Sequence, residues 1–113
     1  MVQKIAIPIT TSGLLHAHFG HCNFIQLFEI EDGKIVKDER LTPPPHATGV
    51  LPKWIADQGA TDIISGGMGQ MAIDILKERG VNAHVGAPNK PAKELVEEFL
   101  ANKLEFSGNG CDH

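Results

Sequence analysis

The sequence predicts an α/β fold in which helices pack against a mixed, mainly parallel five-stranded sheet, in the order βββαβαβα. Three observations lead to this prediction. A nearly continuous apolar segment lies near the start, an Asp-Gly pair joins two extended segments, and the second half alternates short apolar segments with helical periodicity. One hairpin followed by two right-handed crossovers produces such a sheet. The 113 residues correspond to one domain, expected over residues 1–102, with a flexible Gly-rich tail over 103–113.

The first predicted strand covers Ile5–Ile9, which is almost entirely apolar, as a buried strand is. Pro8 belongs near a strand end because it has no N–H to donate to a ladder. The following segment, Thr10–Asn23, shows no hydrophobic period and contains Thr, Ser, Gly and several histidines. We therefore expect a long loop after the first strand.

A hairpin follows this loop. Phe24–Ile30 and Ile35–Leu41 predict two strands, and Asp32 and Gly33 between them are typical of a two-residue turn. The second of these strands carries four consecutive charged residues, Lys37 to Arg40, as an edge strand does when it resists pairing with other chains.

The second half of the chain predicts alternating helices and strands, because its apolar residues recur at helical spacing between short apolar segments. The predicted elements are a helix from Leu51 that stops at Gly59, a strand over Thr61–Ser65, a helix from Met71 that ends at Gly80, a strand over Val81–Val85, and a last helix capped by Asn89 with Pro91 in its first turn.

This order places three loops at one edge of the sheet. Ligands of open α/β sheets bind beyond the carboxyl ends of the parallel strands. The first, fourth and fifth predicted strands end at that edge, so the loops Thr10–Asn23, Ser65–Gly69 and Gly86–Lys90 are expected to share one rim.

Composition and charge exclude several classes of function. The chain has 14 acidic against 10 basic residues and a formal charge of −4, so general binding to nucleic acid or to anionic membranes is not expected. The start of the chain lacks the apolar core of a signal peptide, and no apolar segment is long enough to span a bilayer. The two cysteines are too few for a disulfide framework. We expect a cytoplasmic protein.

The long loop contains four potential metal ligands within seven residues: His16, His18, His21 and Cys22. Imidazole and thiolate suit zinc, copper or iron, and Gly20 gives the loop freedom to bring several of them to one centre. The spacing does not match a zinc finger. The alternative is a polar loop whose histidines face solvent and whose Cys22 is a small buried hydrophobe.

The second candidate is the glycine-rich turn Gly66-Gly67-Met68-Gly69 between a predicted strand and a helix. Its glycines fit a dinucleotide fingerprint, but that motif belongs to the first strand–helix unit and requires an acidic residue after the next strand, which here ends His84-Val85. Backbone N–H groups at the start of a helix also bind other anions. The alternative is that the glycines only permit close packing and that Met68 packs under the loop.

Other polar residues offer less specific signals. Cys111 and His113 end a glycine-rich tail that either folds over a ligand or is disordered. His46 and His84 are predicted to be structural. Catalysis by a Cys22 nucleophile with His18 or His21 as its base lacks a recognisable nucleophile motif and an orienting carboxylate. We therefore expect no enzyme activity.

Three segments together resemble one known family. They are His18-Phe19-Gly20-His21-Cys22, the turn Ile64–Gly69 with the following Ala72 and Ile75, and the last strand–helix unit. In order and spacing they resemble the dinitrogenase iron-molybdenum cofactor biosynthesis family, over Lys4 to Leu100. The chain is similar to the short stand-alone members, a branch of which, the orange proteins, holds a molybdenum-copper sulfide cluster without covalent bonds.

The resemblance implies a ribonuclease H-like three-layer fold and a small protein that binds or carries a metal-sulfide cluster, of molybdenum-copper or iron-molybdenum type, without catalysis. Proteins that donate or accept the cluster are implied as partners. The residues expected to bind the cluster are His16, His18, Phe19, Gly20, His21, Gly66, Gly67, Met68, Gly69 and Met71. Those expected to contact metal are His18, His21, Cys22, Cys111 and His113.

Two other functions remain open at this point. The first is a simple zinc- or copper-binding protein that uses His16, His18, His21 and Cys22. The second is a redox or acyl-transfer enzyme, which requires Cys22 to have an unusually low pKa. The cluster-binding hypothesis instead expects loose, transferable binding, because the chain has few thiolates and a negative charge.

Overall fold

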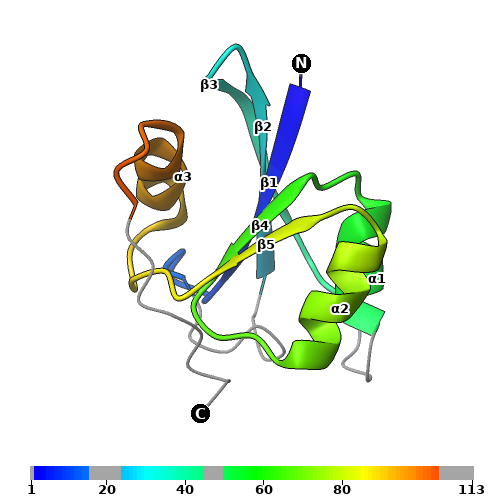
Figure 1. Ribbon diagram of the computed structural model, residues 1–113. Helices are drawn as coiled ribbons and strands as arrows, with labels where there is room; N and C mark the ends of the chain where they lie inside the picture. The colour runs from blue at the N-terminus through cyan, green and yellow to red at the C-terminus, as the bar shows by residue number, and fades with distance from the viewer. Residues whose placement is uncertain (1, 16–23, 45–49, 105–113) are drawn as a thin grey trace.

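The computed structural model describes residues 2–15, 24–44 and 50–104, and within these ranges the elements follow the predicted order βββαβαβα (Figure 1). The strands are β1 (Val2–Ile9), β2 (Phe24–Glu31), β3 (Lys34–Leu41), β4 (Asp62–Ser65) and β5 (Asn82–Val85). The helices are α1 (Val50–Asp57), α2 (Gln70–Glu78) and α3 (Ala92–Leu100).

One five-stranded sheet with the order β3-β2-β1-β4-β5 forms the middle of the molecule. β1 pairs antiparallel with β2 on one side and parallel with β4 on the other, and β4 pairs parallel with β5. The sheet is mixed, as predicted. It is not mainly parallel by its pairings, because both contacts of the hairpin strand β2 are antiparallel.

The hairpin between β2 and β3 has the predicted two-residue turn. Asp32 and Gly33 have φ angles of 54° and 76°, as the central residues of a type I′ turn do. A β-bulge that the sequence did not predict lies farther along the pair, where Glu29 and Ile30 of β2 oppose Lys37 and Ile35 of β3. Val36 is therefore the extra residue, and it is 55% exposed.

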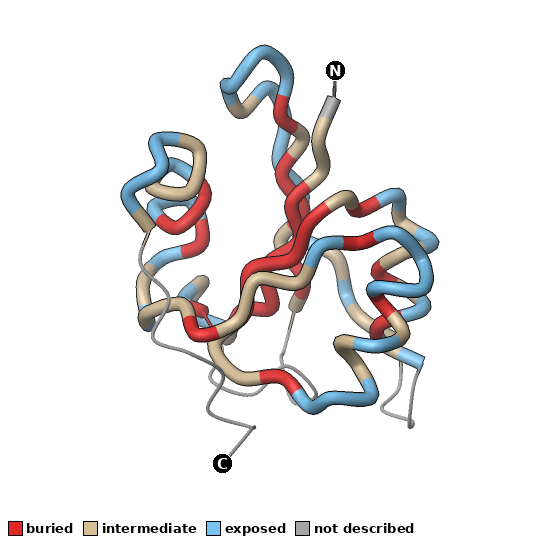
Figure 2. The backbone as a smooth tube through the Cα atoms, in the orientation of Figure 1, coloured by how far each residue is buried: buried red, intermediate tan, exposed pale blue. Residues whose placement is uncertain are grey.

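The sheet separates two hydrophobic cores. α3 covers one face, and α1 and α2 cover the other (Figure 1). Each residue of β4 is buried, and Ile63 and Ile64 contribute to opposite cores. In Figure 2 the buried residues follow the central strands between the helical layers. The largest fully buried side chains include Phe28, Ile5, Ile7, Ile9, Leu15, Ile25, Ile55, Ile63, Ile64, Met68 and Leu76.

The helix ends confirm two predictions and correct one. Gly59 and Gly80 follow α1 and α2 with φ angles of 85° and 79°, the left-handed conformation that favours glycine. Asn89 does not cap α3, however. Pro91 is not in the first turn either. It is the N-cap residue, in extended conformation, and it forms an isolated antiparallel bridge with Leu14, so the helix begins at Ala92.

Contacts with α3 and its core continue past the end of the helix into the first residues of the segment predicted to be a tail. The N–H of Lys103 donates to the carbonyl of Glu98 at 2.8 Å, and Leu104 packs against the α3-side core. Residues 105–113 lie outside the described part of the chain. The three-layer arrangement agrees with the family resemblance, and the ribonuclease H-like label itself stays a prediction.

No helix within residues 2–15, 24–44 and 50–104 is long and apolar enough to cross a membrane.

The packing of α3 against the sheet predicts the effect of a core substitution. Leu95 is 0% exposed in the α3-side core, so Leu95→Ala is expected to lower the free energy of unfolding by about 2–5 kcal/mol. Val36→Ala, at an exposed position on β3, is the control and is expected to cost less than about 1 kcal/mol. Urea unfolding of both variants checks this, and equal losses would contradict the assignment of α3 to the core.

Candidate functional site

Loops from β4 and β5 are joined at the carboxyl edge of the sheet. The N–H of Gly86 donates to the carbonyl of Gly66 at 2.8 Å, and the N–H of Ala87 donates to the carbonyl of Ser65 at 3.1 Å. These bonds continue the parallel pairing of the two strands beyond their ends. The glycine-rich turn after β4 is thus held beside the loop that leads into α3.

The loop after β1 is attached to the same edge. The N–H of Leu15 donates to the carbonyl of Lys90 at 3.0 Å, and the N–H of Ala92 donates to the carbonyl of Gly13 at 3.2 Å. The three loops therefore form one rim, as the strand order predicted, for the residues that the structure describes.

The glycine-rich turn leads directly into α2, and the start of this helix has no side-chain cap. Gly69 is the N-cap residue, and its carbonyl accepts from the N–H of Ile73 at 3.2 Å. The N–H groups of the first turn have no acceptor inside a helix, and the helix dipole gives them a partial positive charge. No acidic residue lies in this turn of α2. The helix start therefore offers hydrogen-bond donors to an anion.

Neither backbone conformation nor packing requires a glycine at position 69. Gly69 has a φ of −70°, which any residue adopts, and a Cβ built on it would meet no atom within 4 Å. Ser, Asp or Asn at this position would stabilise the helix more than glycine does. The glycine instead leaves the N–H groups of α2 approachable, which is consistent with a binding role.

The two methionines near this turn lie in different surroundings. Met68 is 1% exposed and belongs to the core beneath α1 and α2, so its side chain packs under the loop, as the packing alternative proposed. Met71, in the first turn of α2, is 56% exposed. Ser65 is fully buried, and its hydroxyl donates to the carbonyl of Gly67 at 3.3 Å, which holds the turn.

The other predicted ligands lie outside the described residues. They are His16, His18, Phe19, Gly20, His21, Cys22, Cys111 and His113, and His46 lies outside them as well. Among the residues that are described, no three His, Cys, Asp or Glu side chains are grouped so that they could hold a metal ion.

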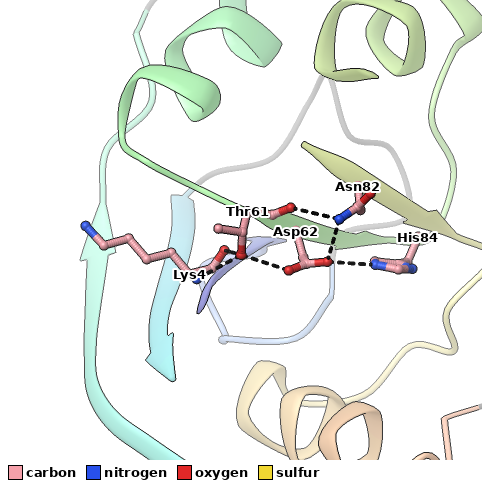
Figure 3. A network of polar contacts seen from close by, with 5 residues as sticks. All are labelled: Lys4, Thr61, Asp62, Asn82 and His84. Atoms are coloured by element: carbon pink, nitrogen blue, oxygen red, sulfur yellow. Dashed lines mark hydrogen bonds and ion pairs between the residues drawn. The ribbon is translucent and has the colours of Figure 1, made fainter. Parts of the chain in front are cut away.

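A polar network lies at the opposite, amino-terminal ends of β4 and β5 (Figure 3). Asp62 is 5% exposed. Its Oδ1 accepts from His84 Nε2 at 3.1 Å and from Asn82 Nδ2 at 3.4 Å, and its Oδ2 accepts from the Thr61 hydroxyl at 2.8 Å. The Thr61 hydroxyl in turn accepts from the backbone N–H of Lys4 at 3.0 Å. The network therefore connects β1, β4 and β5.

The surroundings of Asp62 determine its ionisation. Burial by itself would raise the pKa of this carboxyl, but hydrogen bonds from His84 and Thr61, the charge of His84 and a hydrogen bond from Asn82 outweigh it. The pKa of Asp62 is therefore lower than that of an ordinary aspartate. His84 also packs against the Phe99 ring, with centroids 4.8 Å apart, which agrees with its predicted structural role.

A separate cleft of about 630 Å³ lies between β3 and α3, toward the hairpin end of the sheet. Its lining includes Ile35, Val36 and Lys37 of β3 and Lys93, Glu97 and Leu100 of α3. None of its lining residues belongs to the predicted cluster site.

The chain is similar to a known family and to a protein from an archaeon. The model of the family described as "Dinitrogenase iron-molybdenum cofactor" matches residues 1–102. An uncharacterized protein of Methanocaldococcus jannaschii is 31% identical over 109 residues, which cover 92% of this chain and 91% of that relative.

Two solved structures are similar to the whole fold. The crystal structure of PH0822 matches with a TM-score of 0.87 at 24% identity, over 93% of this chain and 95% of that one. The apo form of the orange protein from Desulfovibrio gigas matches with a TM-score of 0.77 at 18% identity, over 95% and 94% of the two chains. At these identities the likeness establishes a common fold.

The lowered pKa of Asp62 predicts a specific pH dependence of stability. Because the folded-state pKa lies below the unfolded value of about 3.9, the carboxylate contributes stability above about pH 5 and loses it as the pH falls through the folded pKa. Asp62→Asn is expected to cost about 1–3 kcal/mol at pH 7, and the difference from the unsubstituted protein should shrink below about pH 4.

Denaturant unfolding between pH 3 and pH 7 measures this difference. Asp57→Asn serves as the control, because the Asp57 side chain is 66% exposed and its ion pair with Arg79 lies on the surface. A difference between Asp62→Asn and the unsubstituted protein that stayed constant down to pH 3 would refute the role assigned to Asp62.

Proposed function

Because the chain belongs to the dinitrogenase iron-molybdenum cofactor family, we propose that it binds a molybdenum- or iron-containing metal-sulfide cluster at the rim and carries it without catalysing a reaction. The cluster is cargo in this proposal, held without covalent bonds in cofactor biosynthesis or storage. A carrier implies proteins that deliver or receive the cluster. The cytoplasmic location expected from the sequence stays part of the proposal.

The observation that carries the proposal is the start of α2. It has no side-chain cap, no acidic residue in its first turn, and a glycine at a position where a side chain would fit. A metal-sulfide cluster is a bulky anion, and oriented N–H donors at a helix start stabilise such a charge.

The surroundings of this helix start suit a cluster with polarisable sulfurs. The exposed Met71 offers a soft apolar contact beside the N–H donors. The described rim offers hydrogen-bond donors at the start of α2, which suit the negative charge of a preformed cluster. Loose binding of this kind permits transfer to an acceptor protein.

A reconstitution experiment tests the proposed function. The metal-free protein, titrated without oxygen with tetrathiomolybdate and copper, is expected to produce a visible chromophore that stays with the protein on gel filtration. His18→Ala and His21→Ala should weaken this binding, whereas His46→Ala should not. A chromophore that always separates from the protein would rule out this cargo. Analysis of metal and acid-labile sulfide in protein from its native host would then identify any other cargo.

Substitution of Gly69 separates helix capping from cluster binding. Gly69→Asp is expected to raise the free energy of unfolding by a few tenths of a kcal/mol, because a carboxylate caps α2 in open space. The same carboxylate occupies the N–H groups and repels an anion, so cluster affinity should fall about tenfold or more.

Gly69→Asn is the matched control, because it caps the helix without a charge. It should weaken binding less than Gly69→Asp does. Equal affinity of both variants and the unsubstituted protein, measured by equilibrium dialysis, would mean that the start of α2 does not contact the cluster.

A further inference from the structure

Arg40 lies where β3 reaches the rim. β3 runs in the same direction as β1, since both pair antiparallel with β2. Arg40 is opposite Gln26 of β2, and Phe24 at the start of β2 is opposite Ile9 at the end of β1. The carboxyl end of β3 therefore adjoins the same edge of the sheet as the loops after β1, β4 and β5.

The Arg40 side chain is held in place from two sides. Its guanidinium carbon lies 5.1 Å from the centroid of the Phe24 ring, a cation–π contact between diagonal neighbours on one face of the hairpin. A Cβ built on Gly13 would lie 3.7 Å from Arg40 Nη2, so the guanidinium also adjoins the backbone turn after β1. In that turn the N–H of Thr10 donates to the carbonyl of Leu14 at 2.8 Å.

Arg40 forms no ion pair within the described part of the chain. The carboxylate nearest in sequence on its own strand face, Asp38, accepts instead from Gln26 Nε2 at 3.5 Å. The chain has one other arginine, Arg79, which forms an ion pair with Asp57 at 3.5 Å. Among the described residues, a positioned guanidinium without a carboxylate partner is therefore a feature of the rim, and it is unexpected in a chain with an excess of acidic residues.

We propose that Arg40 forms an anion-binding subsite at the β3 side of the rim, where it receives an oxo or sulfido group of the bound cluster. The subsite rests on the proposed function and deepens it. A guanidinium presents a planar set of N–H donors that pairs with such groups, and it keeps its charge at any physiological pH.

The position of this subsite also bears on the size of the ligand. Two strands lie between β3 and β4 in the sheet. β3, which carries Arg40, is therefore about 14 Å from β4, which leads into the glycine-rich turn. Contact with both favours an extended cluster of several metal–sulfur units over a single thiometallate ion.

The experiment compares Arg40→Gln with Arg79→Gln in the full chain, using the chromophore formed from tetrathiomolybdate and copper. Arg40→Gln is expected to raise the dissociation constant about tenfold and to reduce its dependence on NaCl, whereas Arg79→Gln should change it less than about twofold. Arg40→Lys, which keeps the charge but not the fork of donors, should lie between them. Equal dissociation constants for Arg40→Gln and Arg79→Gln would overturn the proposal.

A second measurement distinguishes failure of the subsite from failure of the proposed function. If the unsubstituted protein binds no chromophore, the molybdenum-copper cargo is ruled out, and titration with molybdate then tests the subsite alone. Because the chain has two arginines, their Nε–H signals in an NMR spectrum are readily assigned with Arg40→Lys. A shift of the Arg40 signal without a shift of the Arg79 signal supports the subsite, and equal shifts or none overturn it.

Discussion

The pairing of β1 with two different partners connects the halves of this molecule. β1 is antiparallel to β2 of the hairpin and parallel to β4 of the strand–helix units. Both β1 and β4 contribute side chains to the cores above and below the sheet, so α3 on one face and α1 and α2 on the other must close over them. The order of the sheet, the placing of the helices and the position of the rim all depend on this doubly buried pair.

The two ends of the parallel strands have opposite electrostatic characters. At the amino-terminal end, Asp62 is buried as a carboxylate and is satisfied by His84, Asn82 and Thr61. At the carboxyl end, the start of α2 presents uncapped N–H groups, and Arg40 adds a cation. The buried negative charge thus lies away from the rim, where an anion would be repelled. A chain that is acidic overall can therefore offer a locally favourable site for an anionic cluster.

Local signals in the sequence were reliable where short-range physics determines the structure. Asp32 and Gly33 adopt the positive φ angles of their turn, and Gly59 and Gly80 follow their helices, because these conformations depend on few neighbours. Asn89 and Val36 are positions at which local signals did not predict the structure. Pro91 pairs with Leu14, which is distant in the sequence, and α3 begins only after it. Val36 is displaced by a bulge, which depends on the register of β3 against β2. The family resemblance is confirmed, since it rests on motifs in order along nearly the whole chain.

The sequence by itself determined the order of the elements, the two-sided burial of the central strands and the family, because periodicity, turn residues and motif spacing are properties of the chain alone. Only the tertiary structure decided which candidate groups meet. It buried Met68, left Met71 exposed, paired Asp62 with His84, and placed Arg40 against Phe24 and Gly13. The physical reason is that such contacts depend on strand register and on which face of the sheet each side chain occupies. A shift of one residue in register reverses that face.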